Sequence, residues 1–122
     1  MNAIVIAFSI KNQPFTEIVK KLAEIQMKNR SAVLLHGFMN RKTVVKMGYD
    51  TAVIDALHAY FPWQFNFYNP AYPNPVFRKQ MADVAVALGA TVYVIGEIID
   101  GVKIEIDGYR ERGLEVVQIP LV

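Results

Sequence analysis

Residues 74–122, NPVFRKQMADVAVALGATVYVIGEIIDGVKIEIDGYRERGLEVVQIPLV, decide the fold class. The stretch holds a helical pattern over Val76–Leu88, an apolar strand pattern over Thr91–Ile95 and a final strand pattern over Glu115–Ile119. Helical spacing places Val76, Met81, Val84, Ala85 and Leu88 on the inward face of the first element. Since two parallel strands need a crossover between them, we predict a helix from about Gly101 to Arg112.

A hairpin is the alternative reading of residues 98–106. Asp100-Gly101 is a common hairpin turn, and Val102–Ile106 alternates apolar and charged residues as a strand does. We favour the helix because the last parallel strand requires a crossover, and both readings stay open at this point.

The upstream residues supply the other half of the same fold. Continuous apolar runs predict buried strands at Ala3–Phe8 and Ala32–Leu35, and alternation over Trp63–Tyr68 predicts an edge strand. Amphipathic helices are expected at 15–29 and 51–60, a basic loop at 38–47 and a Pro-rich loop at 69–75. Five strands alternating with four helices predict one α/β domain over residues 1–122, a three-layer Rossmann-like α/β/α sandwich with a mostly parallel five-stranded sheet.

Composition narrows the function classes. The 122 residues are 53% hydrophobic with a net charge of +2, too small for a general nucleic-acid surface. No cysteine and only two histidines are present, so we expect neither a metal site nor a cofactor. No apolar run reaches the ~18 residues of a membrane span, and residues 1–4 do not resemble a signal peptide. We therefore expect a cytoplasmic protein that binds neither nucleic acid nor membrane.

Candidate ligand-binding residues follow the predicted strands. In open α/β sheets, ligands bind beyond the carboxyl ends of the strands, where the strand order reverses. The residues at these ends are Ser9, Lys11 and Asn12 after the first strand, His36 and Gly37 after the second, and Gly96 and Glu97 after the fourth. Backbone amides at a following helix attract anions, so the first group is the strongest candidate for a ligand contact. His36 suits a bond to a ribose, an acid–base role or a structural hydrogen bond to a neighbouring backbone.

Other candidates lie in the loops and helices. Arg41, Lys42 and Lys46 form a basic segment that suits a phosphate or only solvent, and Arg78 suits a phosphate or carboxylate. Asp50 suits a helix cap or a ribose hydroxyl. Tyr68, Tyr72 and Phe77 flank the Pro-rich loop and suit base stacking or packing. Glu105 and Glu97 compete as the carboxylate that would stabilise a sugar oxocarbenium ion, the alternative being solvated surface groups.

The order of these features resembles the small Rossmann-like superfamily that includes SLOG domains and nucleoside 2-deoxyribosyltransferases. The resemblance rests on His36-Gly37, Gly48-Tyr49-Asp50, the Pro-rich loop, Phe77–Met81, Glu105 and Gly113–Val117. It covers nearly the whole chain, and Ser9, Gly37, Arg78, Glu105 and Gly113 stand at matching places. The glycine-threonine pair that usually precedes the glutamate in glycosyl-transferring members is replaced by Gly101-Val102-Lys103-Ile104. The phosphate cradle typical of SLOG domains is likewise replaced by residues 96–101.

Three hypotheses follow. The first is a module that binds a nucleotide or an NAD- or ADP-ribose-derived small molecule, as a sensor or a sequestering protein. The second is a nucleoside or nucleotide N-glycosidase or deoxyribosyltransferase-like enzyme that uses Glu105. The third is an oligomeric scaffold whose aromatic stretch Trp63–Tyr72 is an interface. A homo-oligomer is expected in each case, because proteins cover exposed aromatic edge strands.

Overall fold

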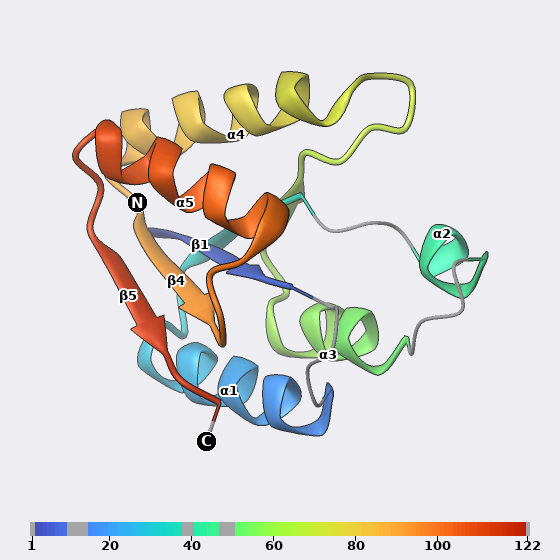
Figure 1. The fold of residues 1–122 in the computed structure, drawn as a ribbon. Coiled ribbons are helices and arrows are strands. Elements are labelled where there is room, and N and C mark those ends of the chain that lie inside the picture. Colours follow the sequence, from blue (N-terminus) through green and yellow to red (C-terminus); the bar gives the residue numbers. More distant parts are fainter. Residues whose placement is uncertain (1, 10–14, 38–40, 47–50, 122) are drawn as a thin grey trace.

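The computed structural model describes residues 2–9, 15–37, 41–46 and 51–121. Its elements are β1 (Ala3–Phe8), α1 (Phe15–Lys28), β2 (Val33–His36), α2 (Arg41–Lys46), α3 (Ala52–Tyr60), β3 (Gln64–Asn66), α4 (Asn74–Leu88), β4 (Thr91–Ile95), α5 (Asp100–Glu111) and β5 (Val116–Ile119). The strands form one five-stranded sheet, and every neighbouring pair is parallel. Helices α4 and α5 cover one face, and α1 and α3 cover the other (Figure 1). The predicted α/β sandwich is confirmed, with an entirely parallel sheet.

The central strand β1 divides the core into two halves. All of its residues are buried, and successive side chains point to opposite faces of the sheet. The bulkier ones pack with α1 and α3, and the smaller ones pack with α4 and α5: Ile4, Ile6 and Phe8 on the first side, and Ala3, Val5 and Ala7 on the second. The small side chains leave room for α4 and α5 to lie close to the sheet.

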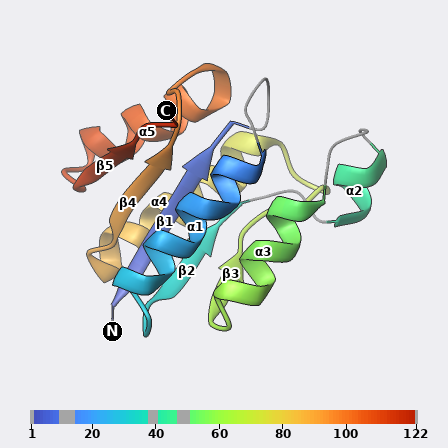
Figure 2. The same cartoon turned by 90° about the horizontal axis from the view of Figure 1, so that it is seen from below.

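The strand order reverses between β1 and β4. The sheet runs β3-β2-β1-β4-β5, so the chain builds outward from β1 to β3 and then crosses back to build β4 and β5 on the other side (Figure 2). Ligands in sheets of this kind bind beyond the carboxyl ends of the strands at such a reversal. The fold therefore makes the carboxyl ends of β1 and β4 the place to look for a site.

Residues 100–111 form a helix, which confirms the favoured reading over the hairpin. Gly108 and several β-branched residues disfavour this helix locally, by up to ~1 kcal/mol per residue. Burial of Ile106 and Tyr109 against the sheet outweighs that preference, because both side chains are at most 1% exposed.

The prediction of a loop over 38–47 is wrong where the structure describes it. Residues Arg41–Lys46 form the short helix α2, so the described part of the chain holds five helices and not four. Val44, only 4% exposed, attaches α2 to the core that contains α3. Periodicity could not reveal this helix, because six residues contain too few turns for an apolar stripe.

The prediction for α4 is right in place and partly wrong in orientation. Met81 and Ala85 are buried as expected, but Val76, Val84 and Leu88 are exposed. Phe77 and Ala82 are buried in their place, because α4 packs against both the sheet and α5. The helix also begins earlier than predicted, at Asn74, where Pro75 fits the first turn because amides there have no partner within the helix.

Candidate functional site

The carboxyl ends of β1 and β4 bring two predicted residues side by side. Phe8 and Ile95 are register partners, so Ser9 and Gly96 continue from adjacent strands. Gly96 is buried with a φ of 80°, its amide donates to the carbonyl of Ile119, and its carbonyl accepts a bond of 3.0 Å from Gln118 Nε2. Gly96 thus turns the chain from β4 toward α5, and Glu97 beside it is exposed.

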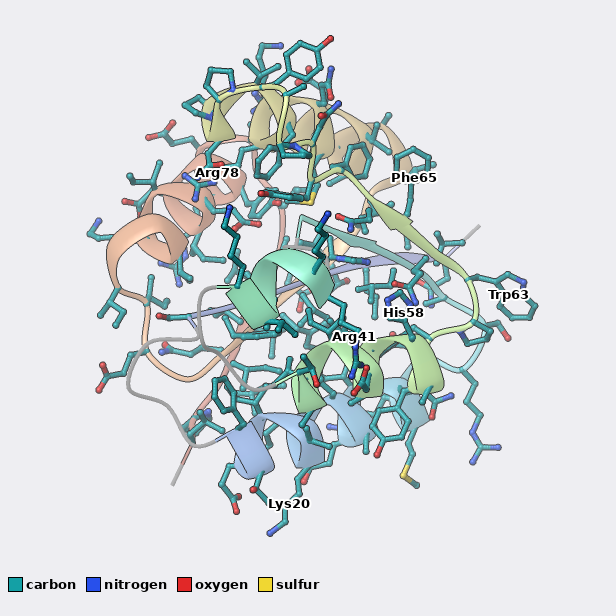
Figure 3. The ribbon with its side chains drawn as sticks, turned by 90° about the vertical axis from the view of Figure 1, so that its right-hand side faces the viewer. Lys20, Arg41, His58, Trp63, Phe65 and Arg78 are labelled. Atoms are coloured by element: carbon teal, nitrogen blue, oxygen red, sulfur yellow. The ribbon has the colours of Figure 1, made fainter. Side chains whose placement is uncertain are left out.

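Arg78 reaches the start of α5 from the second turn of α4. A Cβ added to Gly101 would lie 2.8 Å from Arg78 Nη2, so the guanidinium lies directly against the backbone of Gly101. Figure 3 shows Arg78 on the side of α4 where α5 lies. The first amides of a helix carry a partial positive charge and lack partners within the helix. Ile99 stands at the N-cap position of α5 and has no side-chain oxygen that could accept from them. A guanidinium and a helix start together form a positively charged corner that suits an anion.

Glu105 lies one turn farther along α5, bonded to Tyr109. The Tyr109 hydroxyl donates a bond of 2.9 Å to Glu105 Oε1. Burial raises the pKa of Glu105, and the Tyr109 bond and the charge of Arg78 lower it by smaller amounts. Burial, with the nearby Glu105 charge, also raises the pKa of Tyr109. Arg78, Glu105 and Tyr109 therefore form one electrostatically coupled cluster between α4 and α5.

His36 ends β2 inside the structure. Its Nε2 lies 2.8 Å from Gln64 Oε1, while Gln64 Nε2 donates to the carbonyls of Leu57 and Phe61. Since the Gln64 amide already donates to these carbonyls, its oxygen must accept, and we assign the imidazole proton to Nε2. Burial lowers the pKa of His36 to about 4, with a partly offsetting contribution from the Gln64 bond. His36 is thus a neutral donor that ties β2 to β3 at neutral pH.

His36 makes the stability of the fold sensitive to acid. Because the folded state takes up this proton only near pH 4 and the unfolded chain takes it up near 6.5, stability falls as the pH falls through that window. We expect the wild type to lose about 3 kcal/mol more free energy of unfolding than His36→Gln between pH 6.5 and 4. Urea unfolding of both proteins at stepped pH measures this. Equal losses in His36→Gln and wild type would contradict it.

One residue of the basic segment, Arg41, forms an ion pair with a neighbouring helix. Arg41 Nη1 in α2 pairs with Asp55 Oδ1 of α3, and Thr51 Oγ1 donates to the other oxygen of the same carboxylate. Lys42 and Lys46 are exposed. Helix α2 lies beyond the carboxyl ends of the strands (Figure 1), so its lysines stand on the side of the molecule where a ligand is predicted.

Gly37 and the aromatic residues lie around the start of α4. A Cβ on Gly37 would come within 2.9 Å of Phe77 Cε2, so the Phe77 ring occupies the space that a larger residue would need. Phe77 is buried and meets the Tyr68 ring edge-on at 5.6 Å between centroids. Tyr72 is 56% exposed and remains accessible to a ligand. Lys11, Asn12 and Asp50, predicted as ligand contacts, lie outside the described residues.

Two residues of this region were not predicted. Gln64 sets the tautomer of His36, and Tyr109 bonds Glu105. The spacing of four between Glu105 and Tyr109 puts both on one helix face, so the second was recoverable once α5 was accepted as a helix. The Gln64 bond was not, because it depends on the register between β2 and β3.

Comparisons with known proteins, by a scan against protein-family models and searches of curated proteins and of solved structures, found no match, so the functional assignment rests on the geometry of the candidate site. Among the described residues, no cluster of three His, Asp or Glu side chains could hold a metal ion. No helix within the same ranges is long and apolar enough to cross a membrane.

Proposed function

We propose that the chain binds a nucleotide or an NAD- or ADP-ribose-derived small molecule at the carboxyl ends of β1 and β4, as a sensor or sequestering protein. The observation that carries the proposal is the contact of Arg78 with Gly101 at the start of α5. It places a guanidinium and the first amides of α5 beside the reversal of strand order, where both can donate hydrogen bonds to a phosphate.

The neighbouring groups suit the rest of such a ligand. A carboxylate accepts hydrogen bonds from ribose hydroxyls, and Glu105 lies within the electrostatic reach of Arg78. The exposed Tyr72 ring, on the loop that leads into α4, offers a face on which a base can stack. Phosphate, ribose and base thus each have a suitable group around the first turns of α4 and α5. The resemblance to SLOG-like proteins, which is a prediction from the sequence, also favours a nucleotide-derived ligand.

The proposal is tested by thermal unfolding with a ligand panel of ATP, ADP, AMP, NAD⁺, and linear and cyclic ADP-ribose. A ligand at 100 times its Kd stabilises the folded state by about 2.7 kcal/mol, which raises Tm by about 10 °C for a chain of this size. Adenosine and inorganic phosphate, each carrying part of the ligand, should give small shifts at the same concentration. A panel without any shift would refute the proposal and leave the scaffold hypothesis.

A second candidate is hydrolysis or transfer at the N-glycosidic bond, with Glu105 as the reacting carboxylate. The observation that favours it is a carboxyl group whose pKa is raised by burial and whose position is held by the Tyr109 hydroxyl. Carboxylates held in this way are over-represented at catalytic sites. Release of free base from the panel, followed by chromatography, separates this enzyme from a binding module.

A further inference from the structure

Strand β3 is the outer strand of the sheet and carries an exposed aromatic surface. It pairs with β2 on one side and stands last in the order β3-β2-β1-β4-β5. Trp63, next to its start, is 59% exposed, and Phe65 at its centre is 58% exposed. Figure 3 shows both at the margin of the molecule that lies away from Arg78 and α5.

The aromatic side chains of this segment share one face. Gln64 points to the other face, because its amide donates to the Leu57 and Phe61 carbonyls near the end of α3. Alternation then puts Trp63, Phe65 and Phe67 on the face that α4 and α5 cover. Phe67 is half-buried against the core beneath α4, and its ring centroid lies 4.6 Å from that of Phe65. One side of the Phe65 ring therefore packs against Phe67, and the rest of the ring is exposed to solvent.

Helix α4 extends this apolar surface. Arg78 and Asp83 lie on its α5 side, the second in an ion pair of 2.6 Å with Arg112, the residue that follows α5. Val84 and Leu88, a turn apart, lie on the side of α4 that faces away from α5, which is the side of the sheet that ends in β3, and are 36% and 37% exposed. We call Trp63, Phe65, Val84 and Leu88 the β3 patch.

The β3 edge has none of the charged residues that prevent an edge strand from pairing with another chain. Residues 61–77, FPWQFNFYNPAYPNPVF, contain no Lys, Arg, Asp or Glu. Natural proteins place charged residues, lysine above all, on open edge strands to prevent pairing with another chain. An uncharged edge strand with two exposed aromatic rings is instead suited to an interface with another chain.

We infer that the β3 patch is the interface of a two-fold dimer in which the β3 strands of two copies lie antiparallel, edge to edge. A two-fold axis sets each residue against the same surface of the other copy, so a charge near the axis would meet a like charge. The uncharged segment avoids that repulsion. The rings of Trp63 and Phe65 would then be buried between the two copies.

The size of the patch agrees with a dimer. With 150–250 Å² available on each large aromatic side chain, the open parts of Trp63 and Phe65 contribute roughly 250 Å² per copy. Val84 and Leu88 add roughly 100 Å², which gives about 700 Å² of apolar surface for two copies. A small stable interface buries about 1,200 Å² in total, of which nearly 60% is apolar. The patch therefore supplies the apolar centre of such an interface, with the surrounding polar surface as its rim.

The test is the mass of the protein in solution, by sedimentation equilibrium over a wide concentration range. Wild type is expected to be a dimer, and Phe65→Lys is expected to raise the dimer Kd at least 100-fold, because two lysines would replace two stacked rings at the axis. Trp63→Ser, a milder change at the rim of the strand, should raise it at least tenfold. Circular dichroism and Tm of each variant show whether the monomer is folded.

Ile104→Lys is the matched control. Ile104 is the most exposed large apolar residue among those the structure describes, at 67%, and lies on α5, away from β3. This variant should stay dimeric. A wild type that is monomeric at all concentrations would overturn the inference, and so would a dimer that Phe65→Lys leaves intact or that Ile104→Lys dissociates as readily.

Discussion

Arg78→Gln is expected to remove most of the thermal stabilisation that ADP-ribose or another ligand of the panel gives the wild type. Arg78 lies against the backbone of Gly101, where the amides of α5 begin, and a phosphate bound there would accept charge-assisted bonds from both. Loss of one such bond costs about 1.5–3 kcal/mol, or roughly 10- to 150-fold in Kd. At the concentration that raises the wild-type Tm by about 10 °C, the variant should gain only about 1–5 °C.

Lys79→Gln is the control for Arg78→Gln. It removes the same charge one residue along α4, where Lys79 Nζ pairs with Asp83 at 2.8 Å on the exposed side of the helix. The ligand should therefore stabilise Lys79→Gln as much as wild type. Equal losses in both variants would mean that only the net charge matters, and an unchanged shift in Arg78→Gln would place the ligand elsewhere.

The fold was largely predictable because its strands are short apolar runs. Ala3–Phe8 and Thr91–Ile95 are the strands β1 and β4 without any change of boundary. Errors arose where tertiary contacts override local pattern. Val44 packs α2 against the core that contains α3, and the packing of α4 against the sheet and α5 buries Phe77 and Ala82.

The location of the candidate site was predictable from the sequence, but the contacts within it were not. Ser9 and Gly96 were expected at the carboxyl ends of the first and fourth strands, and the pairing of β1 with β4 makes these two ends adjacent. The approach of Arg78 to Gly101 depends on the packing of α4 against α5, which no local pattern encodes. The same packing partly buries Glu105, which the sequence allowed to be an ordinary surface glutamate.

Glu105→Gln is expected to raise the free energy of unfolding at neutral pH while it weakens function. The pKa of Glu105 is raised by burial, so ionisation destabilises the folded state as the pH rises above the unfolded value near 4.5. Glutamine resembles the protonated form and keeps a carbonyl oxygen for the Tyr109 hydroxyl. The gain over wild type should therefore be absent below pH 4.5 and largest above the raised pKa, in urea unfolding at stepped pH. A residue that costs stability in this way is typical of a functional site.

The functional loss in Glu105→Gln distinguishes the two candidate functions. If the protein is an N-glycosidase, base release should fall about 10²- to 10⁴-fold, whereas a binding module should show only weaker stabilisation by its ligand. Glu97→Gln is the matched control, because Glu97 is exposed at the end of β4 and competes for the same role. It should change neither stability nor function.

Tyr109→Phe supplies a second check, since loss of the hydroxyl leaves Glu105 without this donor and should lower stability by about 1–3 kcal/mol. If Glu105→Gln is less stable than wild type at pH 7, ionised Glu105 contributes net stability and belongs to the structure and not to a site.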